Sequence, residues 1–290
     1  MFEMLPSLAG IRLKLQRADQ QLKALKDEMA VFLQGDVYEP AVKFYGKTRL
    51  GAPRWAVSFD IMMIVKKPCP PHWSVIIGEI VHDLRSALDH CVYQLVIHAT
   101  GVAPAGNIRT QFPIFLDSTK FDASRLQMLK GVSEDAAVLI KQLQPFSTGE
   151  GEKSPLWHLS NLSNFDKHRT LHLTTGMLES FNFSFPPLIS GGQVFKSVSS
   201  KGPFDNNTVI AAGRMISHSD RPMIAGTPVK VNAEITFNIA FDQGTPVVGE
   251  WIVLNTLLDA ANRTRESVDR IGQAVFKLPL DLPEFTFLGS

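Results

Sequence analysis

Hydrophobic residues repeat with a helical period near both ends of the chain. Apolar side chains recur at alternating spacings of four and three through residues 7–35, and the same rhythm returns at 249–275. This stripe is typical of a helix that packs along other helices. Residues 73–100 and 155–172 also read as helices, and 73–100 is the most apolar of all. The sequence therefore predicts a helical bundle closed by its first and last helices.

Two other segments alternate apolar and polar residues, which is the period of a half-buried strand. In residues 36–68 the alternating apolar residues are Trp55, Val57, Phe59, Ile61, Met63 and Val65. In residues 176–245 the clearest run extends from Val229 to Phe241. We expect the two segments to pair into one antiparallel sheet inserted into the bundle.

The predicted fold is therefore α+β, a single domain over residues 1–290. The bundle takes residues 1–35, 69–175 and 246–290, and the β segments are 36–68 and 176–245. Within the bundle, a loop region follows Gly101, and a shorter helix is predicted at about 133–145.

The composition excludes some classes of protein. There are 29 basic and 28 acidic residues, a formal net charge of +1, so any nucleic-acid contact must come from a local patch. Cys69 and Cys91 are too few for a disulfide framework. The N-terminus lacks the layout of a signal peptide, and no apolar run approaches the roughly 20 residues that span a bilayer. We expect a cytoplasmic protein that does not associate with membranes.

The 73–100 helix carries an unusual polar stripe. When its residues are placed on a helical wheel, one side gathers Glu79, His82, Asp83, Arg85, Ser86, Asp89, His90 and Tyr93. The stripe contains no lysine, although solvated helix faces favour lysine, glutamate and glutamine. Such a concentration of imidazole, carboxylate and guanidinium groups indicates a functional site or a buried network.

A second polar group lies on the predicted 155–172 helix. Its members are Asn161, Asn164, His168, Arg169 and His172, on a segment otherwise rich in Leu, Phe and Trp. Polar groups on a mostly buried helix need hydrogen-bond partners. We therefore expect this helix to pack on the 73–100 helix, with His82 or His90 within hydrogen-bonding range of Asn164, His168 or Arg169.

The segment from Arg85 to His90 places an arginine, four residues and a histidine in a bundle helix. It resembles the signature of HEPN domains, helical bundles that include many metal-independent ribonucleases of toxin–antitoxin and phage-defence systems. The segments HDLRSALDH and NFDKHR also resemble a scattered family of uncharacterised bacterial proteins. The second likeness carries no function.

The HEPN resemblance implies that Arg85 and His90 are the catalytic residues. His90 would move a proton at the ribose 2′-hydroxyl or the leaving 5′-oxygen, and Arg85 would stabilise charge on the phosphate. RNA would be cleaved to a 2′,3′-cyclic phosphate without a cofactor. The resemblance also implies a homodimer and a regulatory partner such as an antitoxin. The supporting residues would be Glu79, His82, Asp83, Asp89, Tyr93, Asn164, His168, Arg169 and His172.

Two other hypotheses remain open. Glu79 and His82 form one Glu-x-x-His motif, and with Asp83, His90, His168 and His172 it could hold a metal, although di-iron bundles use two such motifs. Alternatively, the polar stripe is an ion-pair network that fixes the register of the helices. The protein would then be a non-catalytic binding or regulatory module.

Overall fold

The computed structural model describes residues 5–51, 54–106, 110–184, 192–197, 206–217, 232–247, 252–282 and 284–287. The chain forms two compact units. The helical unit contains residues 1–28, 71–172 and 244–290, and the β unit contains residues 29–70 and 173–243. The predicted α+β class is confirmed.

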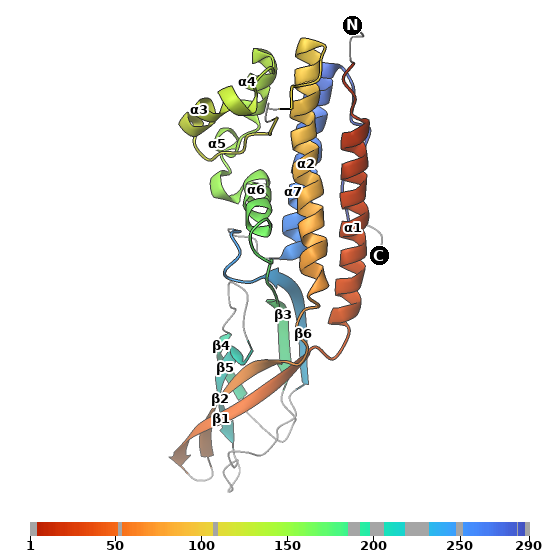
Figure 1. Cartoon of the computed structure of the whole chain (residues 1–290). Coiled ribbons are helices and arrows are strands. Elements are labelled where there is room, and N and C mark those ends of the chain that lie inside the picture. Colours follow the sequence, from red (N-terminus) through yellow and green to blue (C-terminus); the bar gives the residue numbers. More distant parts are fainter. Residues whose placement is uncertain are drawn as a thin grey trace. The chain divides into compact units, whose positions relative to one another are not determined.

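Three long helices run side by side in the helical unit (Figure 1): α1 (Ala9–Leu33), α2 (His72–Thr100) and α7 (Val253–Ile271). Their predicted apolar stripes are buried. On α1, Ile11, Leu15, Ala18, Leu22, Leu25 and Met29 are at most 1% exposed. The heptad-like spacing therefore does mark the packed face. None of the described helices is long and apolar enough to span a membrane.

The remaining helices depart from the sequence prediction in two places. The structure contains α3 (Ser118–Met128), α4 (Glu134–Gln142), the short α5 (Pro145–Thr148), a 3-10 turn at Gly151–Lys153, and α6 (Pro155–Asp166). Helix α7 continues into a π-helical turn at Gly272–Phe276.

Helix α3 lies in what we predicted to be a loop. Phe121 is the only buried residue of this helix, so its sequence needs no apolar stripe and shows none. The local signal that was overlooked is the N-cap, where the carboxylate of Asp117 accepts a hydrogen bond from the backbone N–H of Lys120 at 2.8 Å.

Helix α6 ends at Asp166, six residues before the predicted end at His172. The chain leaves the helix in a turn, in which the backbone N–H groups of His168 and Arg169 both donate to the carbonyl of Phe165. The predicted helical face that joined Asn161 to His172 therefore does not exist beyond Asp166.

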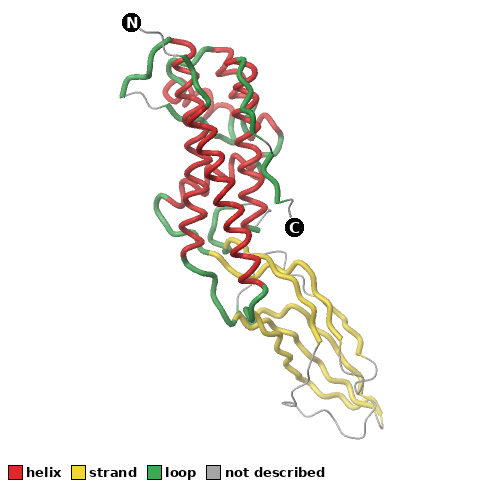
Figure 2. The backbone as a smooth tube through the Cα atoms, turned by 90° about the vertical axis from the view of Figure 1, so that its right-hand side faces the viewer, coloured by secondary structure: helices red, strands yellow, loops and turns green. Residues whose placement is uncertain are grey.

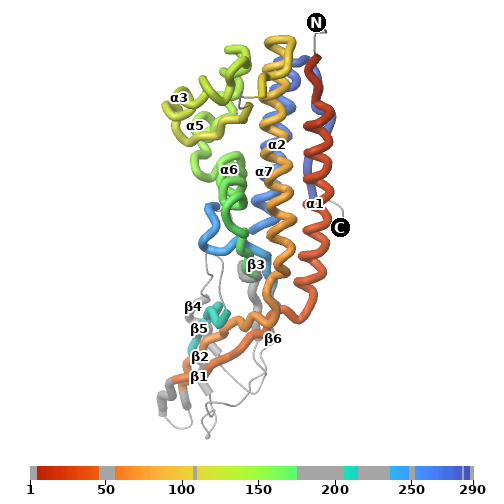
Figure 3. Tube along the Cα trace, viewed as in Figure 1, coloured from red at the N-terminus to blue at the C-terminus, as the bar shows by residue number. Residues whose placement is uncertain are grey.

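The β unit holds two antiparallel sheets in the described residues, drawn in yellow in Figure 2. One has the order β1 (Tyr38–Gly51), β2 (Arg54–Val65), β5 (Thr208–Ser217), β4 (Gly192–Ser197). The other pairs β3 (Leu173–Ser184) with β6 (Asn232–Phe241). The predicted joining of the two β segments is correct for β2 and β5, but β3 and β6 form a separate sheet; the chain can be followed in Figure 3. Val229 and Val231 lie outside the described residues.

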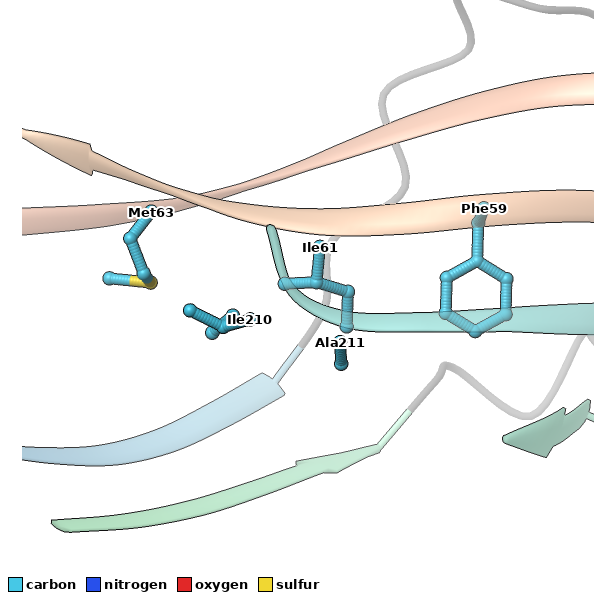
Figure 4. Close-up of a cluster of buried hydrophobic side chains, with 5 residues drawn as sticks. All are labelled: Phe59, Ile61, Met63, Ile210 and Ala211. Carbon is cyan, nitrogen blue, oxygen red and sulfur yellow. The ribbon is translucent and has the colours of Figure 1, made fainter. Parts of the chain in front are cut away.

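The alternating apolar residues of β2 form the core of the β unit. Phe59, Ile61 and Met63 project from one face of the strand toward Ile210 and Ala211 on β5 (Figure 4), and all five are at most 1% exposed. A Cβ on Gly213 would lie 2.6 Å from the Phe59 ring, so that ring occupies the space of the missing side chain. Period-two alternation therefore identified the buried face of this strand.

Candidate functional site

An open groove of about 810 Å³ lies in the helical unit between α1, α2 and the turn that follows α6. Helix α2 supplies Ser74, Val75, Gly78, Glu79, His82 and Asp83. Helix α1 supplies Arg17 and Gln21, and Asp166, His168, Arg169 and Thr170 close the other side. The predicted packing of α2 on α6 is confirmed, and His82 lines one groove with His168 and Arg169. The hydrogen bond expected from His82 or His90 to Asn164, His168 or Arg169 stays a prediction.

The groove depends on a close approach between Gly78 and Asp166. A Cβ on Gly78 would lie 2.7 Å from Oδ1 and 2.8 Å from Oδ2 of Asp166, so any side chain at this position would have to displace the carboxylate. Glycine therefore lets the carboxylate lie against the backbone of α2. Burial raises the pKa of Asp166, and the neighbouring charge of His82 lowers it by a smaller amount. Asp166 and His82 thus interact across the groove.

Along one wall of the groove, an amide from α1 is hydrogen-bonded to a carboxylate from α2. The side-chain amide of Gln21 donates to Oε2 of Glu79. Gln21 is 7% exposed, and its Oε1 is buried without a hydrogen-bond partner among the described atoms. Beside them, Nζ of Lys14 lies 3.4 Å from Oδ1 of Asp83. Arg17 is exposed one helical turn before Gln21.

The early end of α6 brings an imidazole and a guanidinium into the groove. Because the helix stops at Asp166, the turn after it presents His168 and Arg169, which are both exposed. The guanidinium of Arg169 lies 5.8 Å from the centre of the Phe165 ring, a cation–π distance. Asn164 and His172 are exposed but do not line the groove.

Arg85 and Asp89 occupy a different part of α2 and are engaged with each other. Nη2 of Arg85 lies 3.1 Å from Oδ1 of Asp89 and also donates to the carbonyl of Phe112. The same Asp89 oxygen accepts the backbone N–H of Phe112 at 2.8 Å. Burial lowers the pKa of Arg85 and raises that of Asp89, while the attraction between the two opposes both shifts. The Arg85–Asp89 pair, here called the Phe112 clamp, therefore binds both the backbone carbonyl and the backbone N–H of Phe112.

The segment held by the Phe112 clamp is fixed a second time by Gln144, which is fully buried. Its amide oxygen accepts the backbone N–H of Phe115 at 3.0 Å, and its amide nitrogen donates to the carbonyl of Pro113 at 2.8 Å. Side chains from α2 and from Gln144, the residue before α5, thus satisfy the backbone of this irregular segment, as buried peptide groups require.

His90 lies apart from Arg85, near the start of α1. A Cβ on Gly10 would be 3.6 Å from Nδ1 of His90, and the imidazole is exposed. Partial burial and the positive charge of Lys14 lower the pKa of His90, and Asp89 opposes this. Tyr93 is half-buried farther along α2. Arg85, His90 and Tyr93 do not line the groove, so the structure separates the Arg-x4-His pair from the cluster around His82.

Neither thiol is poised as a nucleophile. Burial raises the pKa of both Cys69 and Cys91 to about 12, so each stays protonated at neutral pH. Among the described residues, no group of three or more His, Cys, Asp or Glu is placed to hold a metal ion. Glu79 and His82 share the groove with Asp83, Asp166 and His168, but these side chains are not grouped closely enough to form such a site.

Several groove residues escaped the sequence analysis, including Arg17, Gln21, Val75 and Gly78. The two on α1 read as the ordinary polar face of a bundle helix. Gly78 was the one available signal, because a glycine inside an apolar helix often marks a close approach of another segment.

No family model matches the chain, and no match was found among curated proteins or among solved structures. The functional conclusion therefore depends on the chemistry of the groove.

Proposed function

We propose that the helical unit binds single-stranded RNA in this groove and cleaves it without a metal. One observation carries the proposal: two imidazoles, His82 and His168, and two guanidiniums, Arg17 and Arg169, converge on a single open groove. Imidazoles exchange protons near neutral pH, and guanidiniums bind phosphate oxygens in a forked geometry. RNA supplies both the phosphate and an internal nucleophile, the ribose 2′-hydroxyl.

In the proposed reaction His82 accepts the proton of the 2′-hydroxyl as its oxygen attacks the adjacent phosphorus. The nearby carboxylate of Asp166 stabilises the imidazolium that forms. His168 gives a proton to the departing 5′-oxygen, and Arg17 and Arg169 balance the charge that develops on the phosphate. The products are a 2′,3′-cyclic phosphate and a 5′-hydroxyl. The reaction is that of the HEPN resemblance, with different residues.

In this proposal the Arg85–Asp89 pair has a structural role, because its charged groups hold the backbone of Phe112. The HEPN relationship, the homodimer and the regulatory protein partner stay predictions.

The test is cleavage of a labelled single-stranded RNA in the presence of a chelator. We expect cyclic-phosphate products, and a fall in rate of about 100-fold for His82→Gln and for His168→Gln. His172→Gln is the matched control, since that imidazole is exposed outside the groove. If none of the RNAs were cut, or if both groove variants cut as fast as wild type, the catalytic proposal would be refuted.

A second candidate is a non-catalytic binding module that uses the same groove. It is favoured by one observation. Arg85, the arginine of the HEPN-like motif, is paired with Asp89 and donates a hydrogen bond to the carbonyl of Phe112, so these interactions compete with phosphate binding. In that case Arg17→Ala and Arg169→Ala would weaken binding of RNA that is never cut. Measuring binding and cleavage on the same RNA separates the two candidates.

A further inference from the structure

The groove has two chemically different sides. Arg17, His168 and Arg169 can take an anion, whereas the neighbouring wall of Gln21 and Glu79 offers hydrogen-bond acceptors. An isolated ammonium ligand fits poorly, because the two arginines repel it. A ligand that combines a phosphate with a donor-rich group satisfies both sides.

Among the three carboxylates of the groove, Glu79 has the most capacity left for a ligand. Asp83 is paired with Lys14, and Asp166 lies against Gly78 and beside the charge of His82. Glu79 is exposed and accepts one hydrogen bond, from Gln21. A carboxylate has about four acceptor positions, so most of those on Glu79 remain open.

Gln21 adds a second, independent indication of a ligand. Its side chain is almost fully buried in the groove wall, and its nitrogen is used to hold Glu79, which leaves Oε1 without a donor among the described residues. Buried polar atoms are nearly always paired, so an unpaired one in a residue that lines the groove indicates a partner that a ligand supplies when the Gln21 amide turns to expose this oxygen. That partner has to be an N–H or O–H group.

We infer that the Glu79–Gln21 wall recognises guanine, the base of the nucleotide whose phosphate binds at Arg17 and Arg169. This inference rests on the proposed RNA site and names its base preference. On their Watson–Crick edges, guanine presents three N–H hydrogens, on N1 and N2, whereas adenine and cytosine present two and uracil one. Two carboxylate oxygens and one amide oxygen match the guanine set. Single-stranded RNA is commonly read through that edge.

The spacing of the wall agrees with a nucleotide. Arg17 precedes Gln21 by four residues on α1, a rise of about 6 Å along the same face. Val75 precedes Glu79 by one turn on α2 and is 62% exposed, so it offers an apolar surface beside the acceptors. A phosphate and a base edge can therefore engage α1 and α2 together.

The test measures binding of guanosine, inosine and adenosine 5′-monophosphates to the full chain by calorimetry or NMR titration. Inosine differs from guanosine only by the missing N2 amino group. We expect guanosine monophosphate to bind at least about tenfold more tightly than the other two. Glu79→Gln should abolish this preference, and Gln21→Met should reduce the difference between guanosine and inosine. Glu152→Gln, an exposed residue outside the groove, is the matched control.

The outcomes separate this inference from the proposed function. Equal binding of the three nucleotides, or binding of none, overturns the guanine preference whether or not RNA is cleaved. A guanine preference without RNA cleavage supports the inference and refutes the catalytic proposal. Circular dichroism shows whether each variant is folded, and Gln21→Met provides an independent reading if Glu79→Gln does not fold.

Discussion

Two parts of α2 carry similar ionisable residues but have different surroundings. Arg85 and Asp89 are closed over by the backbone of Phe112, whereas Glu79 and His82, one to two turns earlier on α2, remain exposed at an open groove. Both parts belong to the same polar stripe of the sequence. The comparison teaches that the role of an ionisable residue depends on what covers it, because a covered charge must be paired and an open one can meet a ligand.

The largest expected effect comes from breaking the Phe112 clamp. Arg85→Ala leaves the half-buried Asp89 without its counter-charge, so we expect the free energy of unfolding to fall by about 1.5–3 kcal/mol. Arg169→Ala, in the open groove, should change it by about 0.5 kcal/mol or less. Urea unfolding of both variants measures the contrast.

Two results bear directly on the contrast between the clamp and the groove. Adding Asp89→Asn to Arg85→Ala should recover part of the loss, because no stranded charge remains. Equal stability of Arg85→Ala and Arg169→Ala would show that the clamp is not a structural element.

A smaller effect is expected at the contact that shapes the groove. In Gly78→Ala the new methyl group must displace the Asp166 carboxylate, at a cost of about 1–3 kcal/mol against a helix-propensity gain of about 1 kcal/mol. The pKa of Asp166 should fall toward its ordinary value, since burial is the largest cause of its rise. Carbon-13 NMR of the side-chain carboxyl group measures this pKa.

Gly10→Ala is the matched control for Gly78→Ala. Among the described residues, its added methyl group would meet only His90, at an ordinary contact distance of 3.6 Å. We expect the Gly10 variant to leave the pKa of Asp166 unchanged. If the two alanine variants gave the same pKa, Gly78 would not be the residue that allows the buried position of the carboxylate.

The smallest effect concerns His90 and pH. A base whose pKa is lower in the folded than in the unfolded protein binds fewer protons when folded, so stability rises with pH. For His90, between Lys14 and Asp89, the rise should occur from its lowered pKa up to the ordinary value of 6.5 and then level off.

The pH effect is measured by urea unfolding across that pH range. His90→Gln should flatten the rise, whereas His172→Gln should leave it in place. A rise that persists unchanged in His90→Gln would assign the pH dependence to another group.

The elements of the fold were largely predictable from local pattern. The four–three spacing on α1 and the alternation on β2 each identified the buried face, because the backbone period decides which side chains share a side. Helix α3 was not predictable in this way, since Phe121 alone is buried. The separate β3–β6 sheet was also missed, because strand partners are chosen by contacts far apart in sequence.

The composition of the site was predicted better than its arrangement. The polar stripe of α2 and the residues His168 and Arg169 were identified from the sequence, and so was the packing of α2 on α6. The helical wheel nevertheless grouped His168 with His172, because the pattern did not reveal the end of α6 at Asp166.

The sequence by itself determined that α2 would carry a concentrated polar stripe on an apolar helix. Only the tertiary structure decided which residues of that stripe line the groove and which form the Phe112 clamp. Phe112 reaches Arg85 from 27 residues away, and Gln21 reaches Glu79 from 58 residues away. Such partners are brought together by the burial of distant apolar surfaces, which no local period encodes. Tertiary packing also brings the Asp166 carboxylate against Gly78, where the absence of a side chain leaves room for it.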